Sequence, residues 1–390
     1  MSLKDFKTIK DRRNFVEKQI QGTFQAISVY PQKLEEAAHK NCENMIGAIQ
    51  LPLGIAGPLK IEGTFAKGNF YVPMATTEGA LVASVNRGCK ALISSGITTL
   101  VEDVGITRGS IFETGGLAKG RDLENWIKQN FVKIAKRAAS TSTHLKLMSI
   151  KTKILGTRLF ARFSYHTSEA MGMNMATIAT QKIAEFILRE KGYKCIALAG
   201  NYDTDKKPSW LNFISGRGKQ VWAEGLVRKQ IVEMVLKTTP LDLHKVAIDK
   251  CLIGGALSGS LGFNAHFANV VAAIFIATGQ DPAHVVEGSL GVTSTEVING
   301  DLYISVFLPD LILGTVGGGT NLPAQKESLG ILGHLKKEEG DASLKFAEIV
   351  GAAVLAGELS LLSSIAEGSL SSAHEKFGRA KKEYSDKHES

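Results

Sequence analysis

The amino-acid sequence predicts an α+β fold, with a larger helix-rich domain and a smaller α+β domain inserted into it. Apolar residues at helical spacing recur along the chain, and strand-like runs gather around its middle. After residue 208 the chain again becomes apolar and rich in glycine, which indicates a return to the first domain. Because 390 residues exceed what one simple core organises, we expect two or three domains.

The N-terminal part of the chain is expected to run from helix to loop and back to helix. Residues 1–42 are charged and predict a helical segment, whereas glycine and proline crowd residues 43–73 and favour loops and short extended pieces. A helix is then expected from Thr76 or Thr77 to about Gly96, because apolar residues follow at helical spacing. These residues are Leu81, Val82, Val85, Cys89 and Leu92.

Helices and strand-like runs alternate over residues 109–198. We expect helices at 123–139 and 177–191, and strands at 145–150 and 158–165. Such alternation in a short stretch predicts a compact α+β domain.

The C-terminal half is expected to hold long buried helices at 264–278 and 346–366, followed by a charged, mobile tail at 375–390. The longest apolar runs, at 268–277 and 349–355, are shorter than the roughly 20 residues that span a bilayer. The N-terminus also lacks the apolar block of a signal peptide. We therefore expect a cytoplasmic protein without a membrane anchor.

Charge and cysteine content narrow the class of protein further. The net charge of +8 suits a polyanionic partner, and CoA and NADP are polyanions as much as nucleic acids are. The basic residues are not interleaved with aromatic stacking residues, which disfavours a nucleic-acid partner. Cys42, Cys89, Cys195 and Cys251 lie far apart without zinc-type spacing, so we expect reduced thiols and no metal site.

Two glycine-containing segments could hold a nucleotide. The chain has neither the dinucleotide fingerprint nor the phosphate-binding loop motif, so such a site must be built differently. At 169–175, before an expected helix, and at 314–320, backbone N–H groups can approach a pyrophosphate. Each segment alone is also typical of a tight turn or a methionine-lined core, but their occurrence together favours a nucleotide site.

Two carboxylates stand out by their positions relative to expected helices. Asp281 follows an apolar helix, where the helix dipole disfavours a negative charge, so some other interaction is expected to hold it there. Glu78 lies in the expected first turn of a helix, where the same dipole stabilises an ionised carboxylate. The polar loop at 199–208 lies between two apolar runs, and its lysines are also typical of a solvated surface.

Six runs of residues, in this order, resemble the 3-hydroxy-3-methylglutaryl-CoA (HMG-CoA) reductase family. The runs are 43–47 (ENMIG), 73–79 (PMATTEG), 205–208 (DKKP), 262–266 (GFNAH), 279–281 (GQD) and 314–320 (GTVGGGT). The resemblance covers about residues 42–379, and the DKKP loop and the glycine-rich run favour class I of the family.

The resemblance implies an activity and an architecture. The activity is the two-step, four-electron reduction of HMG-CoA to mevalonate and CoA with two NADPH, or with NADH. The architecture places an inserted ferredoxin-like cofactor domain at 109–198 between the two parts of a large substrate domain at 43–108 and 209–374. Residues 199–208 would form the catalytic loop. It also implies a homo-oligomer, a dimer or a tetramer built from dimers, with active sites shared between subunits.

The resemblance places the family's catalytic groups on Glu78, Lys206, Asp281 and His374. Hydride addition to a carbonyl leaves an oxyanion, which the Lys206 ammonium would stabilise while Asp281 orients the lysine and keeps it charged. Glu78 would be the general acid, and we expect burial and the Asp281 charge to raise its pKa. His374 would protonate the departing CoA thiolate.

The resemblance also implies binding residues. Those for substrate and CoA are Ser84, Asn86, Arg87, Lys90, Arg108, Asp205, Lys207, His266 and Asn269, with Arg108 on the free carboxylate of the substrate. Those for the cofactor are Ser142, Glu169, Met171, Gly172, Met173, Asn174, Met175, Gly317 and Gly318.

This sequence departs from the family pattern at several of these positions. Ala199 replaces the usual serine that contacts substrate, and Glu169 replaces an aspartate. Residues 142–144 (STH) replace a Ser-Arg-Phe run, which weakens the case for binding a 2′-phosphate, although NADPH remains the expected cofactor. Three other interpretations stay open: NAD-dependent oxidation of mevalonate on the same fold, a non-catalytic CoA-binding scaffold, and a basic nucleic-acid binder.

Overall fold

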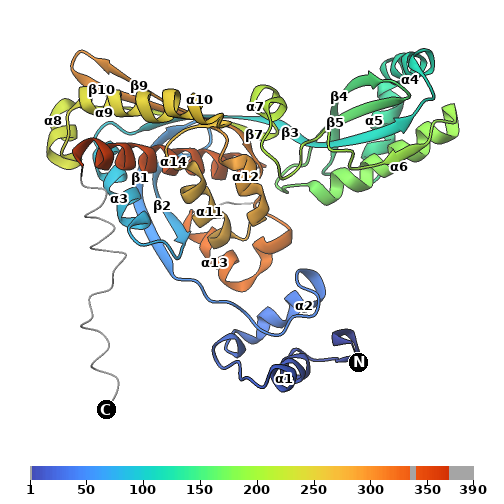
Figure 1. The fold of residues 1–390 in the computed structure, drawn as a ribbon, viewed down its shortest axis with the longest axis horizontal. Helices are drawn as coiled ribbons and strands as arrows, with labels where there is room; N and C mark the ends of the chain where they lie inside the picture. The colour runs from blue at the N-terminus through green and yellow to red at the C-terminus, as the bar shows by residue number, and fades with distance from the viewer. Residues whose placement is uncertain (1, 334–339, 369–390) are drawn as a thin grey trace.

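The computed structural model describes residues 2–333 and 340–368, and it confirms the expected α+β class (Figure 1). A broad body holds most of the helices and strands, and a smaller lobe projects from one side of it. His374 and the expected tail at 375–390 lie outside the described residues.

The strands pair into one extended network in which β3 belongs to two sheets. The main path runs in the order β2-β1-β3-β7-β10-β9-β8. These strands are β2 (Lys67–Ala75), β1 (Leu53–Gly63), β3 (Ile97–Glu113), β7 (Gly218–Val227), β10 (Asp301–Leu311), β9 (Gly291–Ile298) and β8 (Gly262–Phe263). Residues 98–105 of β3 pair with β7 in the body. Residues 106–113 pair with β5 (Arg158–His166) in the lobe.

Gly105 lies where β3 passes from one sheet to the other. Its φ of 82° lies in the left-handed region that favours glycine. A Cβ atom there would lie 2.6 Å from Ser164 Oγ and 2.8 Å from the Tyr165 carbonyl oxygen. The crossing between the sheets therefore requires a residue without a side chain.

The smaller lobe has a hydrophobic cluster of its own and a ferredoxin-like order of elements. After β3 come α4 (Leu117–Gln129), α5 (Phe131–Ala139), β4 (Lys146–Leu155), β5, α6 (Met173–Lys191) and β6 (Cys195–Ala197). The strands pair in the order β4-β5-β3-β6. The strands expected at 145–150 and 158–165 and the helix expected at 177–191 are present as β4, β5 and α6, each longer than predicted. The single helix expected at 123–139 is instead two helices, α4 and α5, which are separated at Asn130.

The glycine- and proline-rich stretch after residue 43 forms longer strands than the sequence predicts. β1 and β2 are an antiparallel pair, whereas we expected loops and short extended pieces. The pairing shifts register between Ala56 and Leu59, where Gly57 and Pro58 lie. A proline within a strand is tolerated at such an irregularity because no ladder hydrogen bond is needed from it.

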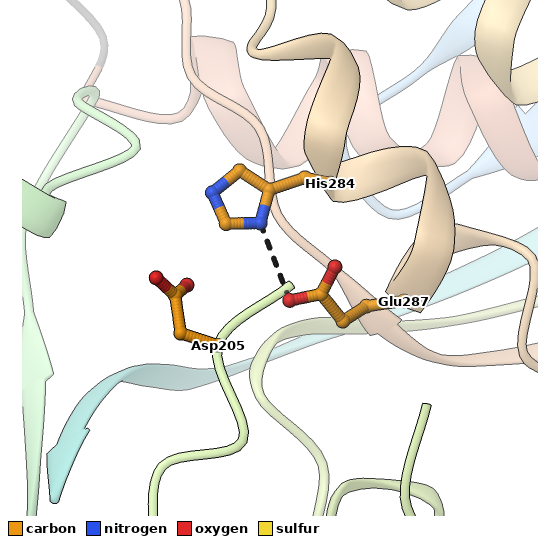
Figure 2. A group of neighbouring side chains, drawn as sticks. All are labelled: Asp205, His284 and Glu287. Carbon is orange, nitrogen blue, oxygen red and sulfur yellow. Dashed lines mark hydrogen bonds and ion pairs between the residues drawn. The ribbon is translucent and has the colours of Figure 1, made fainter. Parts of the chain in front are cut away.

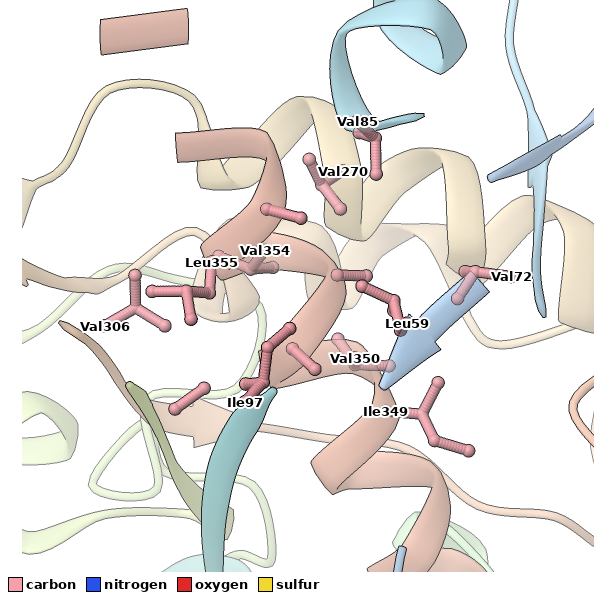
Figure 3. Close-up of a cluster of buried hydrophobic side chains, with 14 of the residues drawn as sticks. Leu59, Val72, Val85, Ile97, Val270, Val306, Ile349, Val350, Val354 and Leu355 are labelled. Carbon is pink, nitrogen blue, oxygen red and sulfur yellow. The ribbon is translucent and has the colours of Figure 1, made fainter. Parts of the chain in front are cut away.

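Helix α14 (Ala342–Glu367) is the centre of the body's core. Figure 3 shows its Ile349, Val350, Val354 and Leu355 packed among side chains of the sheet and of the surrounding helices. By length and composition α14 could cross a membrane, so the expectation that every apolar run is too short is wrong for this helix. Its most apolar stretch is 83% buried inside the protein, however, which is typical of a core helix.

Helix α3 (Leu81–Leu92) packs closely on α14 and starts later than expected. A Cβ atom on Gly88 would lie 1.9 Å from the Ala356 carbonyl oxygen, so glycine permits this contact between the helices. Ala80, with a φ of 74°, precedes the first helical residue. Glu78 consequently lies before the helix and not in its first turn, and the dipole argument made for it from the sequence is wrong.

The remaining elements complete the body and the N-terminal segment. The helix expected at 264–278 is α11 (Phe267–Thr278). The N-terminal helices α1 and α2 lie at the periphery and are joined to the main body by an extended stretch (Figure 1), and their small apolar cluster packs against Leu322 of the body. The other helices are η1 (Leu3–Asp5), α1 (Ile9–Ile20), η2 (Ala26–Ser28), η3 (Gln32–Glu36), α2 (Ala37–Lys40), α7 (Trp210–Ser215), α8 (Lys229–Ile231), η4 (Val232–Leu236), α9 (Pro240–Ala247), η5 (Ile248–Gly254), α10 (Gly255–Ser258), η6 (Pro282–His284), α12 (Val285–Gly288), η7 (Gly318–Asn321) and α13 (Pro323–Ile331).

Candidate active site

The loop at 199–208 connects the lobe back to the body in a constrained conformation. Asn201, Thr204 and Lys206 have φ values of 65°, 52° and 56°. Side-chain-bearing residues adopt this left-handed region at a cost, and such residues persist where the surroundings fix them. The backbone N–H of Lys206 donates a hydrogen bond to Glu287 Oε1, which supplies one such restraint.

Lys206 and Asp281, which are distant in sequence, form an ion pair. Lys206 Nζ lies 2.7 Å from Asp281 Oδ2. Asp281 also caps η6 by accepting a hydrogen bond from the Ala283 amide at 3.0 Å. Partial burial would raise the pKa of Asp281, but these hydrogen bonds outweigh it and hold the pKa below its usual value. The unfavourable interaction of Asp281 with the C-terminal end of the α11 dipole is thus offset by the ion pair with Lys206 and by the cap of η6.

Arg217 lies fully buried beneath this pair and joins two acidic residues. Its guanidinium is 2.8 Å from Asp205 Oδ1 and 3.0 Å from Glu287 Oε1. Burial would raise the pKa of Asp205, but the Arg217 charge and hydrogen bond bring it below its usual value. Burial raises the pKa of Asp310, on β10, to about 8, against the opposing charge of Arg217.

Asp205, on the loop, comes together with His284, in η6, and Glu287, in α12 (Figure 2). Their ligand-type atoms all lie within 4.8 Å of one another, a donor set that suits a metal ion. Arg217 already pairs with both carboxylates, so a guanidinium supplies the positive charge at this point.

Glu78 lines a cavity of about 1050 Å³ together with Ser84, His266 and Asn269. Asn269 Nδ2 donates a hydrogen bond of 3.3 Å to Glu78 Oε1. The Glu78 side chain is exposed, so the expected burial beside Asp281 is not found in the single chain. Within residues 2–333 and 340–368, no ion pair or hydrogen bond joins Glu78 to Lys206 or Asp281.

Three of the four residues expected to bind CoA on α3 are engaged within the chain. Ser84 and Arg87 both bond to Ser360 on α14, at 2.9 Å and 3.0 Å. The Asn86 side chain accepts from the Gly57 amide at 2.8 Å. Lys90 is exposed. These contacts tie α3 to α14 and β1, and Lys90 remains the exposed charge of the four.

Arg108 and Lys207 lie close to the same loop. Arg108 NH1 is 3.2 Å from the buried Asp203, and its other nitrogen atoms donate to Thr177 Oγ1. Lys207 Nζ donates to the Asp205 carbonyl oxygen at 3.1 Å. The structure therefore gathers Arg108, Lys206 and Lys207 where β3 and the returning loop connect the two parts of the chain.

The two glycine-containing segments lie side by side. Ala170 and Val316 form a parallel bridge, and a Cβ atom on Gly314 would lie 2.4 Å from the Met171 nitrogen. At its other end the run contacts the segment before Asp281, because a Cβ atom on Gly279 would lie 2.3 Å from the Gly319 carbonyl oxygen. The run thus passes between the start of α6 and the Lys206–Asp281 pair.

These segments fit an anionic dinucleotide. Gly172, with a φ of 90°, precedes α6, and no side chain caps the first N–H groups of that helix. Gly317 and Gly318 have φ values of 83° and 55° and face open space. Met173 is buried whereas Asn174 is exposed, and Met171 and Met175 lie at the edge of the lobe's apolar cluster.

Glu169 and Ser142 have local partners in the described chain. Glu169 is buried, and its Oε2 accepts from the Ser343 amide at 2.6 Å and from Thr315 at 3.1 Å. Ser142 accepts a hydrogen bond from the His144 amide in the turn before β4. No hydrogen bond between described residues joins Ser142 to either glycine-containing segment.

A family model described as hydroxymethylglutaryl-coenzyme A reductase matches residues 8–379 of the chain. The chain belongs to this family. The HMG-CoA reductase of Methanocaldococcus jannaschii is 51% identical over 375 residues, which cover 94% of this chain and 92% of that protein. The HMG-CoA reductase of Methanothermobacter thermautotrophicus is 49% identical over 373 residues, covering 95% and 93% of the two chains.

Solved structures of HMG-CoA reductase from Streptococcus pneumoniae share the fold. One of them, a class II enzyme bound to NADPH in open conformations, has a TM-score of 0.67 and 17% identity over 92% of this chain and 97% of that chain. Another has a TM-score of 0.67 at 16% identity. At this identity the likeness shows the fold alone, and the expectation of class I membership finds no support in these structures.

Sequence reasoning missed Arg217, His284, Glu287 and Asp310. One signal was available, because Asp310 interrupts the apolar run of residues 306–313, and a charge in such a run requires partners. The other three lie in segments whose local pattern gives no indication of burial.

Proposed function

We propose that this site reduces HMG-CoA to mevalonate and free CoA in two hydride-transfer steps, with NADPH as the hydride donor. The observation that carries the proposal is the Lys206–Asp281 ion pair of 2.7 Å, next to the glycine-rich run. Family membership supports the reaction class.

Lys206 supplies the positive charge that the reaction requires. When bound, the nicotinamide supplies a hydride to the carbonyl carbon of the substrate. The negative charge that develops on the carbonyl oxygen is stabilised by the Lys206 ammonium, and a fixed cation of this kind is worth far more there than in water. The lowered pKa of Asp281 keeps this carboxylate ionised at neutral pH, so that it orients the Lys206 side chain through the ion pair of 2.7 Å.

Glu78 and His374 are proposed as the proton donors. Glu78 lies in the large cavity with His266 and Asn269, where an acyl-CoA thioester has room to enter. A general acid works best with a pKa near the operating pH, and burial is what raises the pKa of a carboxylic acid toward that range. We therefore propose that a second subunit covers Glu78 and completes the site, as the expected homo-oligomer with shared sites implies.

NADPH binding is proposed for the two adjacent glycine-containing segments. The uncapped start of α6 and the open backbone at Gly317 and Gly318 offer N–H groups to a pyrophosphate. The Streptococcus pneumoniae structure bound to NADPH supports a nicotinamide cofactor on this fold. Preference for NADPH over NADH is the finer part of the proposal.

A spectrophotometric assay tests this function. NADPH absorbance is followed with purified protein and HMG-CoA, comparing NADPH with NADH and the wild type with Lys206→Ala. Lys229→Ala, at an exposed surface lysine, is the matched control. We expect two NADPH consumed per substrate, and loss of turnover only in Lys206→Ala. Faster use of NADH would favour mevalonate oxidation as the physiological reaction, and no turnover with either cofactor would support a CoA-binding scaffold.

A further inference from the structure

Lys206 is held at both of its ends by a ring of groups. Its backbone N–H donates to Glu287 Oε1, and its ammonium pairs with Asp281. His284 lies between the two carboxylates, with Nδ1 3.4 Å from Glu287 Oε1 and Nε2 3.8 Å from Asp281 Oδ2. The ring therefore runs from the backbone of Lys206, through Glu287, His284 and Asp281, to the side chain of the same lysine. Its His284–Asp281 step is a 3.8 Å approach and not a hydrogen bond.

The inner members of this ring are fully buried. His284, Glu287 and Arg217 each have 0% side-chain exposure. The contacts of Glu287 with the Lys206 amide, Arg217 and His284 all converge on one oxygen, Oε1. Charged groups that also face this cluster are Asp205, on the loop, Asp310, on β10, Arg108, on β3, and Arg162, on β5.

Stability alone does not account for such a cluster. Buried ion pairs replaced by apolar residues of similar volume often leave a protein equally or more stable, so their presence needs another reason. The ring also ends on a lysine with a φ of 56°, a conformation that persists only where the surroundings over-determine it. Both observations indicate that the cluster fixes the position of Lys206.

We propose that Glu287 and His284 are positioning residues that hold the Lys206 ammonium where the oxyanion forms. Glu287 fixes the backbone of the loop, and His284 couples that anchor to Asp281. The inference rests on the role proposed above for Lys206. Misplacement of a reacting group by about 1 Å can slow an enzyme about 100-fold, so a measurable effect on turnover is expected.

The first test replaces Glu287 with glutamine, which keeps the shape but removes the charge. Glu348→Gln is the matched control, because Glu348 is equally buried and accepts three backbone N–H bonds from residues 64–66, remote from the loop. We expect Glu287→Gln to lower kcat about 10- to 100-fold, with each KM changed less than about threefold. Glu348→Gln should lower thermal stability and leave kcat unchanged. Equal kcat losses in both variants, or none in Glu287→Gln, would overturn the proposal.

A double variant shows whether Glu287 acts through Lys206. Because a positioning residue has no separate route to the substrate, Lys206→Ala combined with Glu287→Gln should turn over no more slowly than Lys206→Ala alone. If the kcat of the double variant fell by the product of the two single losses, Glu287 would act independently of Lys206, which would contradict the proposal. His284→Gln should lower kcat by a smaller factor, about 3- to 10-fold, since it removes one contact of the ring.

A measurement without turnover separates this inference from the proposed function. The amine of Lys206 is labelled with a trace of acetic anhydride, and its labelling is compared with that of the neighbouring Lys207 by mass spectrometry. Lys206 should be protected in the wild type and in Glu348→Gln, and protection should fall in Glu287→Gln and in His284→Gln. If the wild type does not reduce HMG-CoA, the proposed function is wrong. If Lys206 is protected from acetylation equally well in Glu287→Gln and His284→Gln, the positioning role proposed for these two residues is wrong.

Discussion

Lys206 and Glu78 are the two central groups of the proposed chemistry, and the chain supports them very differently. Lys206 is tied at its backbone and its ammonium to partly or fully buried carboxylates. Glu78 is exposed, and among the residues that the structure describes its side chain receives one hydrogen bond, of 3.3 Å, from Asn269. The difference indicates that a single chain positions the electrostatic half of the proposed site, Lys206 with Asp281. The proton-donating half, Glu78, is left exposed by that chain and is proposed to be covered by a second subunit.

The largest expected effect is at the electrostatic half. Lys206→Ala should lower kcat about 1000-fold, since the removal of one preorganised group at an oxyanion typically costs a factor of about 100 to 1000. The loss should be seen in single-turnover reduction of HMG-CoA as well as in the steady state. A variant that kept more than a tenth of the wild-type rate would remove Lys206 from the mechanism.

Glu78→Gln should lower kcat about 100-fold, as expected for loss of a general acid. Because the side chain is exposed in the single chain, its replacement should change the free energy of unfolding of that chain, measured apart from any partner subunit, by less than about 0.5 kcal/mol. Thermal unfolding checks the expected stability, and a pH–rate profile checks the expected loss of kcat and its pH dependence. Loss of the pH dependence at an unchanged rate would show that Glu78 is not the acid.

The buried Asp310, which lies beneath the electrostatic half of the site, should make the stability of the protein depend on pH. The pKa of Asp310 is raised to about 8 from its ordinary value of 3.8, so between these values the folded chain binds a proton that the unfolded chain releases. Stability contributed by this group is present at acid pH and is lost as pH rises through that window, by at most about 1.4 kcal/mol per pH unit. Asp310→Asn should flatten the dependence, measured by thermal unfolding from pH 5 to 8, whereas Asp249→Asn, at an exposed site, should not.

The smallest expected effect is at Lys90, on helix α3, which follows Glu78 in the chain. This exposed lysine is free to meet a phosphate of CoA, and a partly solvated contact of this type is worth about 1 kcal/mol. Lys90→Ala should therefore raise the KM for HMG-CoA about fivefold and leave kcat and the KM for NADPH unchanged. A change confined to the NADPH KM would place Lys90 elsewhere.

Much of the fold was accessible from periodicity. The apolar spacing that predicted α11 and α14, and the alternation in the lobe, follow local rules that burial then reinforces. Periodicity did not predict the start of α3, because Ala80 adopts a left-handed conformation that the sequence does not signal. The two strands in the stretch after residue 43 were also hidden, because Gly57 and Pro58 occupy a register shift within β1.

The candidate site divides in the same way. Motifs placed Lys206 and Asp281 in one site, and the structure pairs them. Arg217, His284 and Glu287 could not be found, because their significance lies in contacts between segments far apart in the chain. Single charged residues carry no periodicity, so only the folded chain shows that these are buried together.

The continuity of β3 has a consequence for motion between the lobe and the body. Within the described ranges 2–333 and 340–368, the chain crosses between them once along β3 through Gly105 and once along residues 199–208. One crossing has a glycine as its joint, and the other contains Lys206. Because residues 199–208 join the lobe to the body, we expect any displacement of the lobe to shift the backbone of Lys206 as well, and with it the ammonium proposed to stabilise the oxyanion.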